Sequence, residues 1–292
     1  MAPELDTDMA LTDREAEIAG LDALDVPLAP AKGRFVRSWE GLWPKLAALA
    51  VFFGGWQIVA WLELKPSFVL PGPIPVLEQF WTDLRSGVLV DATATTMQRA
   101  FVGFALAMII GVVLGLAVAR SRILRAAFGS MITGLQTMPT IAWLPLAVLL
   151  FKLTETAITF VVVLGAAPAI ANGVIAGVDM IPPVLLRAGR VLGAKGVAAY
   201  RYVILPAALP GLVVGLKQGW AFSWRSLMAG ELIVIIAEKP SLGVRLQYAR
   251  ELSDAPALMA AMLGILIIGI VIDSLFFGAF ERGIRRRWGL GG

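Results

Sequence analysis

Long apolar stretches separated by short polar segments recur along the chain from residue 43 to residue 278. Six of them are close to the ~20 consecutive apolar residues that a helix needs to cross ~30 Å of hydrocarbon. They cover residues 43–63, 97–119, 127–151, 155–178, 207–237 and 257–278. Only Lys152–Thr154 separate the third stretch from the fourth, so this boundary is the least defined. The pattern predicts an all-α membrane protein with six transmembrane helices.

The segments outside these stretches differ in composition. Residues 1–31 contain eight acidic residues and one basic residue. Such a segment buries too little apolar surface to fold, so we expect an acidic, disordered tail. After it we expect a first membrane helix within residues 32–64, an extracytoplasmic segment over residues 65–96 and a core domain over residues 97–287.

Lysines and arginines set the predicted orientation. Basic residues are dense at residues 120–125, 187–201 and 282–287, whereas residues 65–96 and 238–254 carry acidic residues as well. Cytoplasmic segments of membrane proteins carry an excess of lysine and arginine. Both termini are therefore predicted to be cytoplasmic, and the tail over residues 1–31 with them.

Composition supports the membrane prediction and excludes several kinds of chemistry. Hydrophobic residues make up 58% of the 292 residues and charged residues only 16%, whereas soluble domains carry roughly 25% charged residues. The absence of cysteine and histidine excludes disulfides, thiol nucleophiles, Cys/His zinc sites and imidazole catalysis. The net charge of +4 follows from the topology, since no basic, aromatic-bearing soluble module that would bind nucleic acid is present.

A segment of mixed character, residues 182–206, lies between the fourth and fifth apolar stretches. Pro182 and Pro183 suit the first turn of a helix, where the missing N–H donors cost little. Apolar residues then recur at intervals of three to four residues, and Gly193 and Gly196 bracket a turn. The pattern predicts a helix–turn–helix at the inner face of the membrane.

This segment resembles the EAA loop of permease subunits in binding-protein-dependent ABC importers. That pattern consists of Glu-Ala-Ala, three residues, Gly, nine residues and Ile-x-Leu-Pro. The present chain has Arg187-Ala188-Gly189, then Gly193 and then Val203-Ile204-Leu205-Pro206, and it keeps both spacings. Arg187 replaces the acid and Gly189 replaces the second alanine, which alters any salt bridge that the acid would form. The resemblance implies contact with an ATPase subunit by these residues: Arg187, Ala188, Gly189, Gly193, Ala194, Val203, Leu205 and Pro206.

The resemblance extends over about residues 70–287 and is closest to the branch that handles sulfonates, taurine, nitrate and similar anions. It is carried by four further motifs, at residues 70–77, 95–104, 139–146 and 224–233, while Phe151-Lys152 departs from the usual Phe-Gly pair. It implies a type I ABC importer permease-like bundle with a cytoplasmic coupling helix pair, in the bacterial inner membrane. The implied cargo is a small anion, first an aliphatic sulfonate or taurine, with nitrate, bicarbonate or an aromatic acid as alternatives.

The resemblance also implies the partners. They are two copies of an ABC ATPase subunit, a second permease copy as a homodimer, an extracytoplasmic solute-binding protein and membrane lipid, without nucleic acid. The chain has no GxxxxGK[ST] phosphate loop, so we expect it not to be an enzyme and ATP and Mg²⁺ to bind the partner ATPase. We expect no cofactor and no metal on this chain.

Ionisable residues within a span usually face the interior of a bundle or an aqueous path. On the fifth stretch Lys217, Trp224 and Glu231 lie seven residues apart on one face, beside a second row formed by Gln218 and Arg225. This face is a candidate anion pathway in which Lys217 and Arg225 attract the anion. The alternatives are that Arg225 pairs with Glu231 or another acid, that Glu231 serves structure, and that Lys217 extends to the interface.

The other polar residues of the spans are weaker pathway candidates. Thr137, Thr140 and Asn172 are of the types that hydrogen-bond between membrane helices. For Asp273 we expect an ion pair with the arginines that follow it. A six-span secondary transporter or channel, which would favour an acidic relay or inverted repeats, and a membrane enzyme with a Ser–Lys or carboxylate pair are competing interpretations. The sequence shows none of these features clearly and does not specify the anion.

Overall fold

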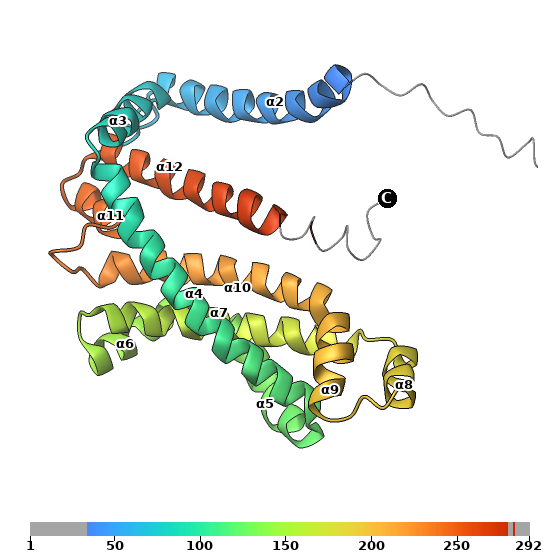
Figure 1. Cartoon of the computed structure of the whole chain (residues 1–292). Coiled ribbons are helices and arrows are strands. Elements are labelled where there is room, and N and C mark those ends of the chain that lie inside the picture. The colour runs from blue at the N-terminus through green and yellow to red at the C-terminus, as the bar shows by residue number, and fades with distance from the viewer. Residues whose placement is uncertain (1–33, 280–282, 284–292) are drawn as a thin grey trace, which may run out of the picture. The chain divides into compact units, whose positions relative to one another are not determined.

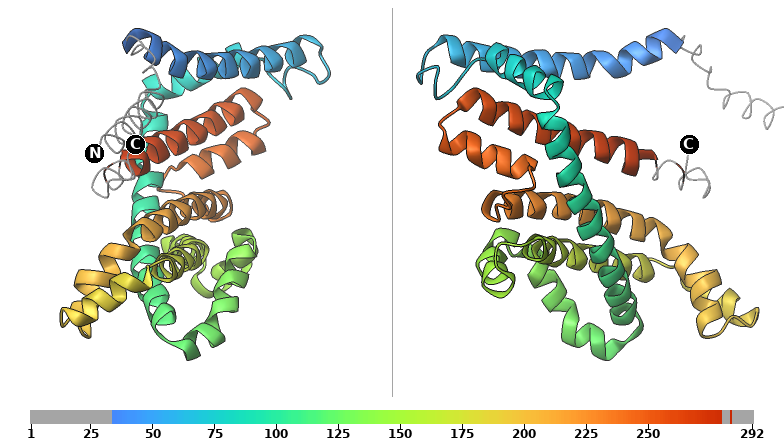
Figure 2. Two further views of the ribbon diagram at one scale, coloured as in Figure 1. Left: turned by 90° about the vertical axis from the view of Figure 1, so that its right-hand side faces the viewer. Right: turned by 60° about the vertical axis from the view of Figure 1, so that its left-hand side comes forward.

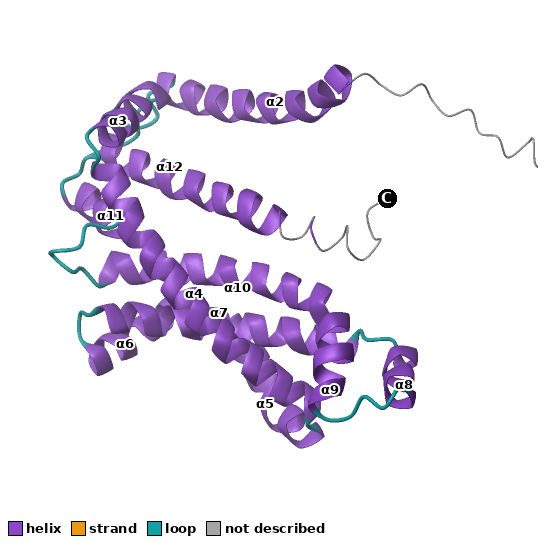
Figure 3. Ribbon diagram, in the orientation of Figure 1, coloured by secondary structure: helices purple, strands orange, loops and turns teal. Residues whose placement is uncertain are grey.

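The computed structural model describes residues 34–279 and residue 283, and all regular elements of this part are helical (Figure 1 and Figure 3). In chain order they are α2 (Arg34–Trp61), α3 (Pro73–Arg85), α4 (Val88–Arg120), α5 (Arg122–Thr137), η1 (Thr140–Trp143), α6 (Leu144–Phe151), α7 (Glu155–Asp179), α8 (Pro183–Val191), α9 (Val197–Ala199), η2 (Tyr200–Ile204), α10 (Leu205–Ile233), α11 (Leu242–Glu251), α12 (Ala255–Ile272) and η3 (Asp273–Phe277). The predicted all-α class is confirmed. The predicted tail, residues 1–31, lies outside the described residues.

Helix α2 belongs mainly to the first of two compact units, which ends at Ile58. Its segment Leu42–Trp61 is long and apolar enough to cross a membrane, and none of its most apolar stretch is buried. Phe52, Phe53 and Trp56 contact one another, with ring centroids 5.4–6.2 Å apart. An uncovered apolar helix of this length is stable in lipid, where apolar side chains cost nothing to expose.

Helix α7 forms the centre of the second unit and packs against both α4 and α10 (Figure 2). The packing against α10 depends on glycine. A methyl group on Gly173 would overlap the backbone of Gly215, and one on Gly211 would overlap the backbone of Gly177. Each pair of glycines on one helix is four residues apart, the small-xxx-small arrangement that lets membrane helices approach closely. Helices α7 and α10 therefore meet backbone to backbone.

The third apolar stretch, predicted as one span over residues 127–151, is instead bent. Helix α5 ends at Thr137, and the segment Thr140–Phe151, formed by η1 and α6, leaves it at an angle of 101°. Pro139 precedes η1 and Pro145 lies in the first turn of α6, positions where proline interrupts one helix and starts another. Over the described part of the chain, five helices are long and apolar enough to cross a membrane each, or six if this bent pair is one span.

Other helix boundaries also differ from the predicted ones, those of α4 and α10 among them. Helix α4 begins at Val88 rather than at residue 97, inside the segment predicted to be extracytoplasmic. Helix α10 ends at Ile233 rather than at residue 237, and Val234 has a non-helical backbone. Both differences arise because helices continue or stop according to local hydrogen bonding, while hydropathy reports only the apolar length.

The short helices α3 and α11 lie where α4 begins and α10 ends (Figure 1). Arg245 of α11 forms an ion pair with Asp83 of α3, and Gln79 donates a 3.0 Å hydrogen bond to the same carboxylate. Helix α3 also packs against α12. These contacts hold α3 against the membrane-spanning part of the unit.

Candidate functional site

Helices α8, α9 and η2 form a helix–turn–helix, here called the elbow (residues 183–204), between the ends of α7 and α10 (Figure 1). The turn contains Gly193 and Gly196, with φ angles of 81° and 55°. This left-handed region is open to glycine and strained for residues with a side chain. The second arm continues directly into α10, so the elbow is joined to a membrane helix without a flexible linker.

The two arms of the elbow are held together at Gly189. A methyl group on this buried residue would come within 2.7 Å of the Val203 side chain, so glycine permits the approach. Gly189 also accepts a 2.9 Å hydrogen bond from the amide of Ala194. Three of the residues predicted to contact an ATPase thus support the elbow itself.

The other predicted residues of this set lie on the surface. Arg187 and Ala188 are exposed on α8, Gly193 is exposed in the turn, and Leu205 and Pro206 are exposed at the start of α10. Beside them, apolar residues of the elbow are strongly exposed: Val191 by 87%, Leu192 by 85% and Val197 by 83%. An exposed apolar patch among basic residues is typical of a protein-binding surface.

Polar contacts connect the elbow region to α4 and α5. The Arg120 guanidinium, at the end of α4, lies 5.5 Å from the ring centroid of Tyr200. Arg125 of α5 forms two hydrogen bonds with the Asp179 carboxylate at the end of α7, of 2.7 and 2.8 Å. The elbow therefore lies at the end of the bundle where α4 and α7 finish.

The polar residues predicted on α10 occupy different surroundings. Lys217 Nζ lies 3.6 Å from Asp273 Oδ2, and both side chains are about half exposed. Lys217 is the ion-pair partner of Asp273 among the described residues; the arginines expected to fill this role, from residue 282 onward, lie outside them. Gln218 is exposed, and Trp224 stacks on Trp220 with a centroid distance of 6.4 Å.

Arg225 does not pair with Glu231, so that predicted alternative is wrong. Its Nε donates a 3.2 Å hydrogen bond to the Ala221 carbonyl, and its guanidinium carbon lies 4.9 Å from the Phe222 ring centroid. The residue is exposed, and within the described chain it forms no ion pair with an acid.

Arg225 lines a groove of about 620 Å³ between α10, α11 and α12. Its other walls include the rings of Trp220 and Trp224, the side chains of Met228 and Met262, and Asp273. The groove therefore combines one unpaired cation with aromatic and thioether surface. This arrangement suits a small solute with an anionic group and an apolar part.

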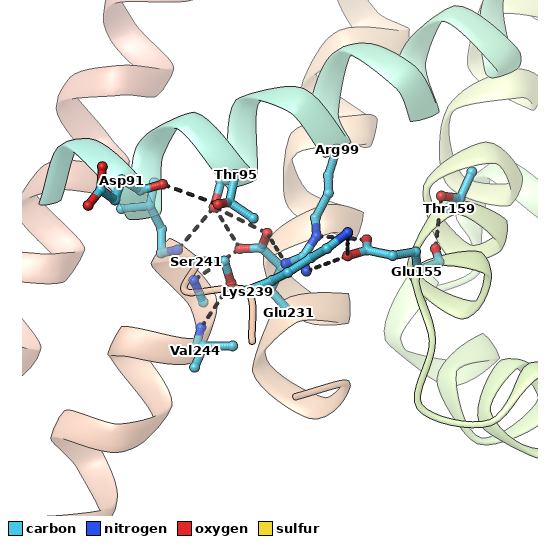
Figure 4. Close-up of polar contacts among 12 residues, drawn as sticks. Asp91, Thr95, Arg99, Glu155, Thr159, Glu231, Lys239, Ser241 and Val244 are labelled. Atoms are coloured by element: carbon cyan, nitrogen blue, oxygen red, sulfur yellow. Dashed lines mark hydrogen bonds and ion pairs between the residues drawn. The ribbon is translucent and has the colours of Figure 1, made fainter. Parts of the chain in front are cut away.

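Glu231 belongs to an ion cluster formed by Thr96, Arg99, Glu155, Glu231 and Lys239 (Figure 4). The Glu231 carboxylate is fully buried and accepts hydrogen bonds from Thr96 Oγ1 at 3.0 and 3.1 Å, Arg99 Nη1 at 2.9 Å and the Gly243 amide at 3.1 Å. Every face of this buried charge thus meets a donor, which burial of a charge requires.

Arg99 connects the two acids of the ion cluster. Its Nε and Nη2 donate 2.8 Å hydrogen bonds to the two oxygens of Glu155, and Lys239 Nζ lies 3.2 Å from the same carboxylate. Two cations and two anions balance, and they tie α4, α7 and α10 together at the end opposite the elbow. These contacts fit the structural alternative that the sequence leaves open for Glu231, and its pathway role stays a prediction.

The sequence pattern singles out Glu231 but gives Arg99 and Glu155 no role as site residues. One signal for them does exist: all three are ionisable and lie near the same predicted boundary of their spans. Such residues are costly unless they are paired. Three of them at one depth indicate a shared network.

Thr137, Thr140 and Asn172 lie on or next to the bent third span. Asn172 Nδ2 donates a 2.6 Å hydrogen bond to Gln136 Oε1 and so connects α7 to α5, while Thr137 Oγ1 donates to the Gly134 carbonyl at 2.9 Å. The methyl carbon of Thr140 lies close to Gly165 of α7. These contacts belong to helix packing, and the pathway role of the three residues stays a prediction.

Among the described residues, no group of three His, Cys, Asp or Glu side chains is arranged to hold a metal ion.

Comparison with known proteins gives a consistent result. The family model described as "binding-protein-dependent transport system inner membrane component" matches residues 107–286. A probable ABC transporter permease protein of Brucella melitensis is 32% identical over 242 residues, which cover 83% of this chain and 96% of the relative. The taurine transport system permease protein of Escherichia coli is 32% identical over 233 residues, or 78% of this chain and 84% of the relative.

Other relatives carry different substrate names, and solved structures share the fold. The riboflavin transport system permease protein of Chloroflexus aurantiacus is 33% identical over 84% of this chain and 91% of its own length. An inward-facing structure of the MetNI methionine ABC transporter superposes with a TM-score of 0.60 at 22% identity, covering 69% of this chain and 98% of that chain.

Proposed function

This chain belongs to the family of binding-protein-dependent transport system inner membrane components, and from that premise we propose that it is the permease subunit of an ATP-driven importer for a small organic anion. In this proposal two copies form the pathway, and each receives movement through its elbow from one ATPase subunit that binds ATP and Mg²⁺. An extracytoplasmic binding protein delivers the anion. The membrane is the bacterial inner membrane.

The observation that carries the proposal is the exposed apolar surface of the elbow. Val191, Leu192 and Val197 are each more than 80% exposed, in a segment that also carries the exposed Arg187 and Lys195 and is too polar to enter the hydrocarbon layer. Apolar side chains in water favour association with a partner. Because η2 continues into α10, a partner that grips this surface moves a membrane helix as a rigid body.

The finer proposal concerns the cargo. Asp273 neutralises Lys217, so Arg225 is the α10 cation available to an anion in the groove of about 620 Å³. The tryptophan and methionine side chains beside it suit the carbon part of an aliphatic sulfonate such as taurine better than they suit nitrate or bicarbonate. The relatives are named for taurine, aliphatic sulfonates, nitrate and riboflavin, and we place this chain with the first two.

Reconstitution tests the proposal. The chain is incorporated into liposomes with its ATPase and binding protein, and uptake and ATP hydrolysis are measured with taurine, ethanesulfonate, nitrate, bicarbonate and an aromatic acid. We expect ATP-dependent uptake of a sulfonate. Uptake by the chain without an ATPase would refute the importer assignment, and stimulation by nitrate alone would refute the cargo.

A matched pair of variants tests the elbow. Leu192→Asp places a charge on the exposed apolar surface and is expected to reduce ATPase binding at least tenfold without affecting folding. Leu252→Asp is the control, because Leu252 is 78% exposed between α11 and α12, at the other end of the bundle. Equal ATPase binding by the two variants would remove the elbow from the interface.

A further inference from the structure

An apolar groove of about 500 Å³ lies between α3, α4 and α12, and neither the elbow nor the α10 groove contributes to it. Its walls include Phe80 of α3, Leu89 and Val90 of α4, and Gly264 and Ile267 of α12. These side chains offer carbon surface without a charge, and the hydroxyl of Thr93, which also lines the groove, is already used in a 2.7 Å hydrogen bond to the Leu89 carbonyl. A groove of this kind selects a hydrocarbon occupant.

The groove lies at the end of the bundle opposite the elbow and at membrane depth. Helix α4 ends beside the elbow, where Arg120 contacts Tyr200, and its first turns, at Leu89 and Val90, line the groove. The α12 wall, residues 264–268, is about 14–20 Å along the helix from Ala255 at ~1.5 Å per residue, and one leaflet contributes ~15 Å to the hydrocarbon layer. This wall therefore lies at the depth that the end of an acyl chain of the extracytoplasmic leaflet reaches.

Helix α3, which forms one wall, carries apolar side chains on two sides. One side is buried: Val76 is 0% exposed, and Asp83 is bound by Arg245 of α11. The other side exposes a stripe at intervals of three and four residues, formed by Ile74, Leu77, Trp81 and Leu84. A short helix that is anchored on one side and apolar on the other is suited to the membrane interface.

The end of this stripe combines an aromatic ring with a cation. The Arg85 guanidinium lies 4.9 Å from the ring centroid of Trp81, directly after Leu84, which lines the groove. Tryptophan and basic side chains are enriched at the level of lipid head groups, and arginine binds phosphate well. A phosphate-binding group thus stands at the α3 wall of a groove that suits hydrocarbon.

We propose that this groove binds one acyl chain of a phospholipid in the extracytoplasmic leaflet, with Arg85 at the lipid phosphate. The exposed surface of α12 continues from the groove along Ile267, which lines it, and Val271 one turn further on, which are 39% and 42% exposed. A lipid in the adjoining bilayer therefore reaches the groove without leaving the hydrocarbon. The bound chain packs α3 against α4 and α12 and completes the apolar surface of this end of the protein.

Photocrosslinking tests the site. The purified transporter is placed in nanodiscs with a phosphatidylglycerol that carries a diazirine in its acyl chain, and adducts are mapped by mass spectrometry. We expect adducts at Leu84, Val90 and Ile267 at least fivefold above those at Leu149 of α6, which is 80% exposed. Equal labelling at these positions means ordinary annular lipid only and overturns the proposal.

A matched pair of glycine variants makes the test specific. A carbon added at Gly264 meets only the ends of Leu89 and Phe80, at 3.3 and 3.8 Å, so Gly264→Leu fills the groove at little cost in packing. Gly134→Leu is the control, because nothing lies within 4 Å of a carbon added there. We expect Gly264→Leu to reduce the groove adducts at least fivefold and the control to leave them unchanged; unchanged adducts in both variants overturn the proposal.

Trp81 supplies a second measurement that does not depend on a variant of the groove. Brominated phospholipids quench tryptophan in contact with lipid, and the difference between the wild type and Trp81→Phe isolates this residue. We expect strong quenching by lipid brominated near the head group. Absence of quenching means that protein covers this side of α3, and it overturns the lipid assignment.

Discussion

Replacing Glu231 with alanine removes the acceptor at the centre of the ion cluster (Figure 4). The carboxylate is fully buried, so water does not take its place without entering the bundle. In the variant the Thr96 hydroxyl and the Gly243 amide lose their acceptor, and Arg99 keeps Glu155 as its remaining carboxylate. The change therefore leaves three donors with fewer partners in a dry site.

The magnitude follows from these contacts. Removing one partner of a buried ion pair costs about 3–5 kcal/mol. Arg99 keeps two 2.8 Å hydrogen bonds to Glu155, so we expect the lower end of this range for Glu231→Ala. A loss of about 3 kcal/mol reduces the folding equilibrium constant about 140-fold, since 1.4 kcal/mol is a factor of about ten.

The assay is equilibrium unfolding in mixed micelles, followed by circular dichroism. Glu231→Gln keeps one acceptor oxygen and is expected to lose about 1–2 kcal/mol. A double-mutant cycle with Arg99→Ala then measures the pair itself, with an expected coupling of at least about 1 kcal/mol. A loss below about 0.5 kcal/mol for Glu231→Ala, or additive effects of the two alanine variants, would refute the direct contact.

Three further predictions concern the elbow, the helix crossing and the cargo. Gly193→Ala places a side chain on a residue with a left-handed backbone conformation. We expect the free energy of unfolding to fall by about 1–2 kcal/mol and substrate-stimulated ATP hydrolysis in the reconstituted complex to fall as well. In Gly173→Ala the added methyl group would overlap the α10 backbone. We expect the free energy of unfolding to fall by about 1–3 kcal/mol in the same unfolding assay, whereas Gly134→Ala is expected to leave it unchanged. Arg225→Ala is expected to raise the substrate concentration for half-maximal uptake at least tenfold. Lys217→Ala is expected to raise it less, because Asp273 already neutralises that lysine. A larger increase for Lys217→Ala than for Arg225→Ala would make Lys217 the anion-binding residue instead.

The approximate places of the apolar spans follow from the sequence because apolar length is what hydropathy measures. The bend in the third span does not. Residues 127–151 have the same apolar content whether the chain is straight or turns by 101°. Pro139 and Pro145 mark a break, but the angle depends on packing against α7, which the local sequence does not contain.

The elbow is the part of the site that is closest to its prediction. Its turn is specified locally, since Gly193 and Gly196 tolerate the positive φ angles that the turn requires. Its length is set by the spacing between the prolines before α8 and Leu205-Pro206 at the start of α10. Contact of this surface with an ATPase subunit stays a prediction until the complex is measured.

The sequence leaves the ion-pair partner of Glu231 undecided, and the positions of the helices identify it. Arg225 and Glu231 are six residues apart, and at ~100° per residue they lie ~120° apart around α10, too far round the helix for a direct pair. That step excludes Arg225, but it does not identify Arg99 on another helix. Pairing between helices depends on the crossing of α4, α7 and α10, and the glycines reveal this crossing only once the helices are placed.

Helices α7 and α10 are connected at three levels, and these connections bear on how movement passes through the molecule. The elbow joins them at one end, Gly173 and Gly215 bring their backbones together, and Arg99 bridges Glu155 and Glu231 at the other end. Because of these contacts, α7 and α10 are expected to move together when the elbow is displaced. Between α10 and η3, by contrast, the Lys217–Asp273 pair is half exposed and borders an open groove. Exposed ion pairs contribute little, about 0–1 kcal/mol, so α10 and η3 are held together mainly by the buried Phe277, whose ring centroid lies 6.0 Å from that of Trp220. Trp220 also lines the groove in which the proposed anion-binding arginine lies.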